Sequence, residues 1–73
     1  MVLGGDKVNG NKITLKAARV NANYTLIEAA KAIGIGKDTL IKWERTPDVV
    51  QPRYQKIISE VYQLPIEAIF FGI

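Results

Sequence analysis

The stretch from Thr25 to Glu44 reads TLIEAAKAIGIGKDTLIKWE, and it holds two short helical patterns separated by a glycine-rich connection. Thr25 and Glu28 form a capping box, in which the threonine oxygen accepts an amide hydrogen of the first turn and the glutamate accepts from the amide of Thr25. Gly34 marks the end of the first helix, because glycine enters the left-handed conformation freely. The stretch therefore predicts two helices joined by a tight turn.

The apolar residues of both helices fall at spacings that let the helices pack together. Those of the first helix are Ala29, Ala30 and Ile33, and the two alanines allow a close crossing. Gly36 is an acceptable N-cap for the second helix, whose buried side is formed by Leu40 and Trp43. The residues expected on its other surfaces are Lys37, Asp38, Ile41 and Lys42. Together these features predict a helix-turn-helix motif.

Composition limits the function classes that remain. The chain has 73 residues, enough for one small domain, and it contains neither cysteine nor histidine. These absences, together with the lack of paired carboxylates or a glycine-rich phosphate loop, argue against an enzyme, and we expect no metal and no cofactor. No apolar run reaches the ~20 residues of a membrane span, and no signal peptide is evident, so we expect a cytoplasmic protein.

Charge is distributed unevenly along the chain. The net charge is +3, and all ten lysines and arginines precede Ile57. This asymmetry favours a basic working face in the first three-quarters of the chain. Residues 1–12 are rich in glycine and asparagine, and we expect them to form a flexible arm. Part of this arm could be an addition that the natural protein lacks. The domain itself is expected to span residues 13–73.

A helical pattern is expected from Ile13 onward. Its apolar face includes Arg19, which needs a partner because an unpaired buried charge is costly. We expect that partner to be Glu44, and the alternative is that Arg19 extends to the edge of the core.

After Glu44 a loop bounded by prolines leads to a helix beginning at Pro52, and a last short helix follows Pro65 and ends at Gly72. No segment alternates with period two. The prediction is an all-α, compact five-helix bundle.

The ordered set of residues resembles the lambda-repressor-like helix-turn-helix domains of phage repressors, Cro proteins and small bacterial regulators. The residues that carry the resemblance are Arg19, Thr25, Glu28 to Ala30, Gly34, Ile35, Thr39, Leu40, Trp43 and Glu44, and it extends from about Ile13 to Gly72. It implies a regulator of transcription that binds double-stranded DNA, with the helix Lys37–Arg45 in the major groove. It also implies an ion pair between Arg19 and Glu44.

The resemblance assigns two sets of DNA contacts. Base contacts are expected from Lys37, Asp38, Thr39, Ile41 and Lys42, and backbone contacts from Thr25, Arg45, Arg53 and Tyr54. The alternatives are that the lysines contact phosphate or only solvent, that Asp38 and Thr39 serve the helix start, and that Ile41 packs on a partner protein.

The sequence also departs from the family pattern. Leu26 stands where many members carry a phosphate-binding glutamine, and the loop after Arg45 is weakly basic. These departures support a second hypothesis, in which the same fold is a protein-interaction module that binds another regulator. The apolar end, Ile69 to Ile73, exceeds what a small bundle is expected to bury, and it predicts a homodimer.

Overall fold

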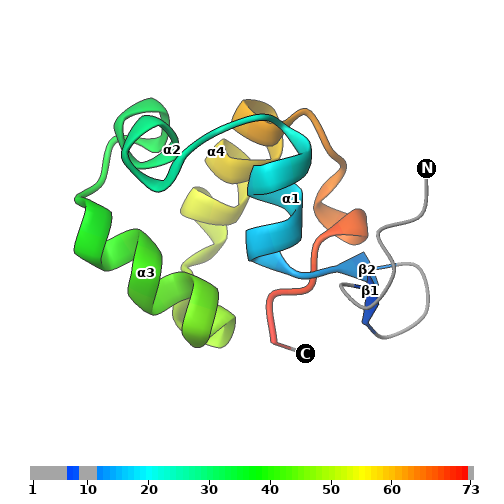
Figure 1. The fold of residues 1–73 in the computed structure, drawn as a ribbon. Helices are drawn as coiled ribbons and strands as arrows, with labels where there is room; N and C mark the ends of the chain where they lie inside the picture. Colours follow the sequence, from blue (N-terminus) through cyan, green and yellow to red (C-terminus); the bar gives the residue numbers. More distant parts are fainter. Residues whose placement is uncertain (1–6, 9–11, 73) are drawn as a thin grey trace.

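The computed structural model describes residues 7–8 and 12–72, and most of the expected N-terminal arm lies outside the described residues. Helices dominate the fold (Figure 1). In chain order the elements are β1 (Lys7–Val8), β2 (Lys12–Ile13), α1 (Leu15–Asn21), α2 (Leu26–Ile33), α3 (Lys37–Arg45), the 3-10 helix η2 (Pro47–Val49), α4 (Pro52–Tyr62) and the 3-10 helix η3 (Ile66–Ala68).

Helices α2 and α3 form the expected helix-turn-helix. The Thr25 hydroxyl accepts from the amide of Glu28 at 3.1 Å, and the Glu28 carboxylate accepts from the amide of Thr25 at 3.0 Å. Gly34 ends α2 with a φ of 92°, in the left-handed region that favours glycine. Gly36 is the N-cap of α3, and it makes no side-chain cap bond. The capping box, the glycine turn and the bounds of α3 are therefore confirmed.

A small sheet lies on the side of the molecule opposite α3, and the sequence pattern did not predict it. Strand β1 pairs with β2 in antiparallel register, and Ile13 forms a parallel bridge with Ile69. The amide of Phe70 donates to the carbonyl of Ile13 at 2.8 Å. The expectation of a helix from Ile13 is therefore wrong. Helix α1 begins at Leu15, because the Thr14 hydroxyl accepts from the amide of Ala17 and caps it there.

The C-terminal end differs from the expected fifth α-helix. Only Ile66–Ala68 is helical after Pro65, as the single 3-10 turn η3, and Ile69 is extended. The bridge from Ile69 to Ile13 accounts for this, because pairing with β2 requires an extended backbone. Within the described residues the fold thus has four α-helices, and the predicted helix through Phe71 is wrong.

The core lies between the four α-helices and the C-terminal segment. Its buried members are Leu15, Ala18, Ala29, Ala30, Ile33, Leu40, Trp43, Val50, Ile58, Tyr62, Ile69 and Phe71. Ile69 and Phe71 are buried within the domain, so the expectation that the apolar end is left over for a partner is wrong for these two residues. Val50, in the loop before α4, was not expected in the core.

Candidate nucleic-acid interface

Helix α3 has one buried side and one polar, exposed side. Leu40 and Trp43 enter the core, as the sequence predicts. The exposed residues of the helix are Lys37, Asp38, Thr39, Lys42 and Arg45, while Ile41 is half-buried. The buried pair marks the side of α3 that faces the core, and the polar set covers the rest of the helix surface.

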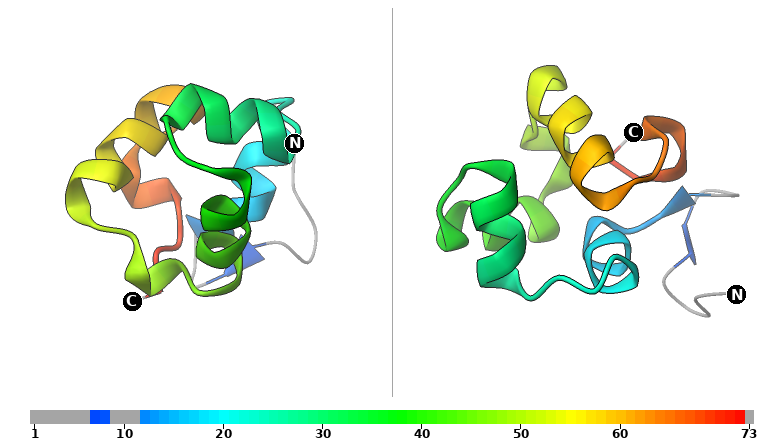
Figure 2. Two further views of the ribbon diagram at one scale, coloured as in Figure 1. Left: turned by 90° about the vertical axis from the view of Figure 1, so that its left-hand side faces the viewer. Right: turned by 90° about the horizontal axis from the view of Figure 1, so that it is seen from above.

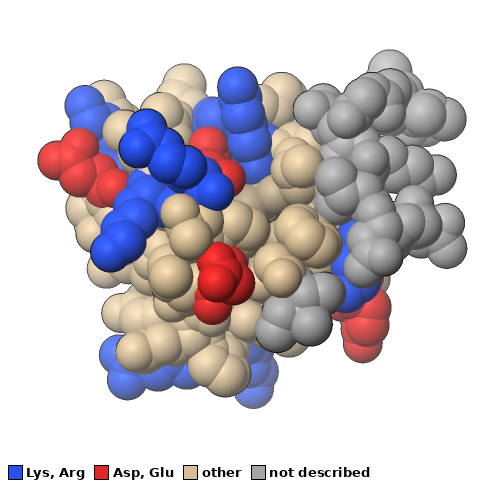
Figure 3. Space-filling view, turned by 90° about the horizontal axis from the view of Figure 1, so that it is seen from below, with Lys and Arg blue, Asp and Glu red and all other residues tan. Residues whose placement is uncertain are grey.

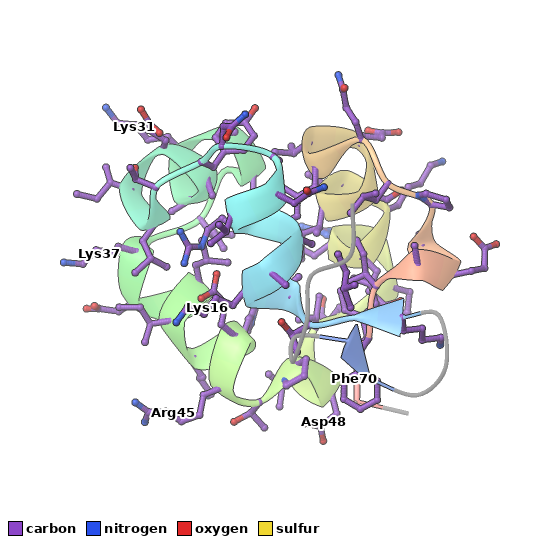
Figure 4. All side chains as sticks on the ribbon, turned by 45° about the vertical axis from the view of Figure 1, so that its right-hand side comes forward. Lys16, Lys31, Lys37, Arg45, Asp48 and Phe70 are labelled. Atoms are coloured by element: carbon purple, nitrogen blue, oxygen red, sulfur yellow. The ribbon has the colours of Figure 1, made fainter. Side chains whose placement is uncertain are left out.

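Basic side chains gather on the side of the molecule that carries α3. Figure 3 shows lysines and arginines gathered over one part of the face seen from below, with acidic side chains among and beside them. Lys37 and Arg45, from the two ends of α3, both extend away from the body of the protein (Figure 4). The side chain of Lys16 reaches from α1 toward the side of α3 in the same view. The sequence pattern did not assign Lys16 to this surface.

A tilted contact between two aromatic rings connects α3 to the beginning of α4. The ring centroids of Trp43 and Tyr54 lie 5.2 Å apart, and the guanidinium carbon of Arg53 lies 5.1 Å from the centroid of the Tyr54 ring. A cation over an aromatic face at this distance is favourable. Tyr54 thus holds Arg53 near the C-terminal part of α3. The sequence pattern places Trp43 in the core but carries no signal for this contact between the two rings.

At the start of α2, the exposed Thr25 can donate a hydrogen bond to a ligand at this surface. Its oxygen already accepts a bond within the capping box, which leaves the hydroxyl hydrogen free to donate to an external acceptor. Leu26 is packed partly against the core, and its neighbour Ile27 is exposed. The apolar residue that the helix start presents to solvent is therefore Ile27.

Arg19 ties the polar helix α3 to α1. Its Nε–H donates to Glu44 Oε2 at 2.7 Å, and Nη1 donates to the carbonyl oxygen of Tyr24 at 2.9 Å. The guanidinium therefore holds the end of α3 and the connection between α1 and α2 at the same time. The alternative, in which Arg19 extends to the edge of the core, does not describe this side chain, which is buried and paired with Glu44.

Tyr62 lies near the ion pair, and the sequence pattern assigns it only to the core. Burial raises the pKa of Tyr62 well above the ordinary value of a tyrosine, and the negative charge of Glu44 raises it further. Its hydroxyl has no hydrogen-bond partner among the residues that the structure describes. The ring centroid lies 6.0 Å from that of Tyr24.

Two other site classes find no support in residues 7–8 and 12–72. No cluster of acidic residues there has the arrangement of a metal site, and the chain lacks histidine and cysteine. None of the helices in this part of the chain is long and apolar enough to pass through a bilayer.

Two helices joined at a left-handed glycine, with the second helix presenting a polar face beside basic side chains, define a helix-turn-helix domain. The family model HTH_3, described as Helix-turn-helix, matches residues 15–69, more than half of the chain. The chain therefore belongs to the lambda-repressor-like, or XRE-type, helix-turn-helix family, whose members are DNA-binding regulatory domains. No curated protein and no solved structure matches it significantly.

Proposed function

We propose that this protein is a sequence-specific regulator of transcription of the phage repressor or Cro type, which binds double-stranded DNA with α3 in the major groove. The observation that carries the proposal is the exposed polar side of α3, with Lys37 and Lys42 on it and Arg45 at its end, in a helix-turn-helix domain. A helix of this size fits the major groove, where each base pair presents a distinct set of donors and acceptors.

Five side chains of α3 are proposed to meet base edges. Lys37 and Lys42 would donate to guanine O6 and N7, and Asp38 would accept from a cytosine N4 group. Thr39 would donate or accept at either kind of base, and the half-buried Ile41 would pack on a thymine methyl group. The exposed lysines and aspartate satisfy the first requirement for these roles, which is access to solvent.

Four side chains around α3 are proposed to contact the DNA backbone. Arg45 and Arg53 are exposed at the two ends of the turn that joins α3 to α4, and each would pair with a phosphate. Thr25 would donate its free hydroxyl hydrogen. Tyr54 would act both by a polar contact of its own and by holding Arg53 over its ring.

A homodimer is proposed as the DNA-bound form. A symmetric dimer reads two half-sites and thereby gains specificity that a single short helix lacks. Ile69 and Phe71 are buried within the domain, so an exposed apolar C-terminal segment does not support the dimer. The support is the need to read two half-sites. Such a regulator would act in the cytoplasm, where bacterial and phage DNA is found.

An exposed isoleucine favours a second candidate function. The side chain of Ile27 is 58% exposed at the start of α2, next to the proposed DNA contact Thr25. A module of the same fold that binds another regulatory protein would use such a residue, together with Ile41, as its contact. On that hypothesis Ile27→Glu abolishes a protein complex and leaves duplex binding, weak from the start, nearly unchanged.

A salt titration of duplex binding tests the two candidates against each other. A protein held by several phosphates loses affinity steeply as salt rises, because binding releases counterions. We expect binding to random duplex DNA at low salt, with a log–log slope near −0.9 for each phosphate contacted. A parent protein that shows no salt-dependent binding at low salt contradicts DNA binding and favours the protein-interaction module.

A further inference from the structure

The end of the chain returns to the turn between α3 and α4. Residues 69–72 leave η3, run beside β2 and end next to η2 (Figure 1), and a second view shows the same proximity (Figure 2). The bridge from Ile13 to Ile69 and the bond from the Phe70 amide to the Ile13 carbonyl hold the beginning of this segment. Phe71 is buried in the same core as Val50, which follows η2.

Gly72 packs against the backbone of Asp48 in η2. A Cβ atom placed on Gly72 would lie 2.6 Å from the Cβ of Asp48 and 2.9 Å from its Cα and N. Two of these three atoms belong to the backbone, so the conflict could not be relieved by turning a side chain. Gly72 also has a φ of 93°, in the region that side chains rarely adopt. Glycine is thus required here both by conformation and by space.

The turn that Gly72 touches connects the two arginines of the proposed DNA-backbone contact. Arg45 ends α3 just before it, and Arg53 is the second residue of α4 just after it. Within the turn, the amide of Val49 donates to Thr46 O at 3.3 Å and that of Val50 to Pro47 O at 3.1 Å. The Gln55 amide group donates to the carbonyl of Val50 at 3.1 Å. These bonds hold the inner side of the turn, and Gly72 contacts it at Asp48.

We propose that residues 69–72, acting through the contact of Gly72 with Asp48, hold this turn in the position that lets Arg45 and Arg53 reach phosphates together. Gly72 is then a positioning residue for DNA binding although it is 19 residues beyond Arg53. The proposal rests on the proposed function, because it assigns the two arginines to the same DNA backbone.

Three glycines provide a matched set of variants. Gly72→Ala combines the strain of a positive φ with the conflict at Asp48. Gly34→Ala carries the same strain at a φ of 92° but meets nothing within 4 Å, and Gly36→Ala meets neither penalty. Comparing the first two variants isolates the contact from the loss of stability.

Two measurements follow on the full chain. In amide NMR spectra we expect Gly72→Ala to shift the signals of residues 46–50, and Gly34→Ala to leave them in place. Against random duplex DNA, after correction for the folded fraction, we expect Gly72→Ala to bind about tenfold more weakly and to reduce the salt slope by about one unit, as expected when one phosphate no longer pairs. Gly34→Ala is the control for the amide spectra only, because Gly34 closes the turn between α2 and α3 and belongs to the proposed DNA-binding motif itself.

If Gly72→Ala does not fold, the same two measurements are made on a chain that ends at Phe71. This truncation removes the contact with Asp48 without adding backbone strain. The proposal is overturned if the variant that folds keeps the amide signals of residues 46–50 in place. It is also overturned if the salt slope of that variant equals the parent's. Failure of the proposed function gives a different result, because the parent protein itself then does not bind duplex DNA. In that case Gly72 has no positioning role in DNA binding either.

Discussion

Arg19 and Glu44, 25 residues apart in the chain, form an ion pair with a distance of 2.7 Å between Nε and Oε2, and their side chains are only 10% and 11% exposed. The pair joins α1 to the last turn of the helix proposed to enter the major groove. Removing one partner from such a pair leaves the other charge buried without compensation. The pair therefore links the stability of the domain to the placement of α3.

We expect Arg19→Ala to lower the free energy of unfolding by about 3–5 kcal/mol, a large share of the stability of a small domain. Urea unfolding monitored by circular dichroism measures the change. Arg45→Ala, which removes an exposed arginine, is the control and should change stability by less than ~0.5 kcal/mol. An Arg19→Ala protein as stable as this control would show that the pair contributes little.

The turn between α2 and α3 gives a second prediction. Gly34→Val should lower the free energy of unfolding by well over ~1 kcal/mol, because a β-branched residue is strained at a φ of 92°. Since no atom lies within 4 Å of a Cβ at this position, the cost is conformational and not a clash. Gly36→Ser should be neutral or stabilise the protein by a few tenths of a kcal/mol, because serine can cap α3. Equal stabilities of the two variants would contradict this assignment.

Neutralising the basic residues separates backbone contacts from base contacts. Arg45→Gln and Arg53→Gln should each weaken binding to all duplexes and reduce the salt slope by about one unit. Lys37→Gln and Lys42→Gln should change the preference among operator sequences by roughly 1–3 kcal/mol for each base-reading side chain that is removed. Fluorescence anisotropy with specific and random duplexes at two salt concentrations measures both effects.

Lys31→Gln is the matched control for these four variants, since Lys31 is exposed on α2 and is not among the proposed DNA contacts. Its binding and slope should resemble the parent's. Equal effects of all five substitutions would indicate a general influence of net charge instead of specific contacts.

Tyr62 predicts how stability depends on alkaline pH. Burial raises its pKa in the folded protein, so the folded state keeps a proton that the unfolded chain releases above about pH 10. The stability associated with the neutral tyrosine is therefore complete below that pH and is lost as the pH rises beyond it. Urea unfolding between about pH 8 and pH 11 should show a fall that is smaller in Tyr62→Phe.

At neutral pH, Tyr62→Phe should cost little stability, because no described residue bonds to the hydroxyl. If Tyr62→Phe loses as much stability at alkaline pH as the parent, the group that titrates is not Tyr62.

Much of the helix-turn-helix could be predicted because its determinants are local. The capping box of Thr25 and Glu28 and the left-handed Gly34 depend on residues three apart or on one backbone angle, and both are confirmed. The N-terminal strands could not be predicted in this way. Ile13 is extended because it pairs with Ile69, and no pattern within either segment reveals a partner 56 residues away.

In the candidate site, too, some features follow from local sequence and others depend on distant segments. The polar side of α3 follows from helical periodicity, once Leu40 and Trp43 are placed in the core. The position of Arg53 does not follow from periodicity, because it depends on the contact of Tyr54 with Trp43 from another helix. The contact of Gly72 with Asp48 is likewise set by two segments that meet only in the folded chain.

By itself, the sequence determined where α2 and α3 begin and end and which side of α3 faces the core, because hydrogen bonds and apolar spacing act over one or two turns of helix. The tertiary structure alone decided that the C-terminal segment is extended, that Phe71 and Val50 share the core, and that Gly72 packs against Asp48 in the turn between Arg45 and Arg53. Those features arise from packing between distant segments, whose gain in buried area outweighs the local preference for a last helix.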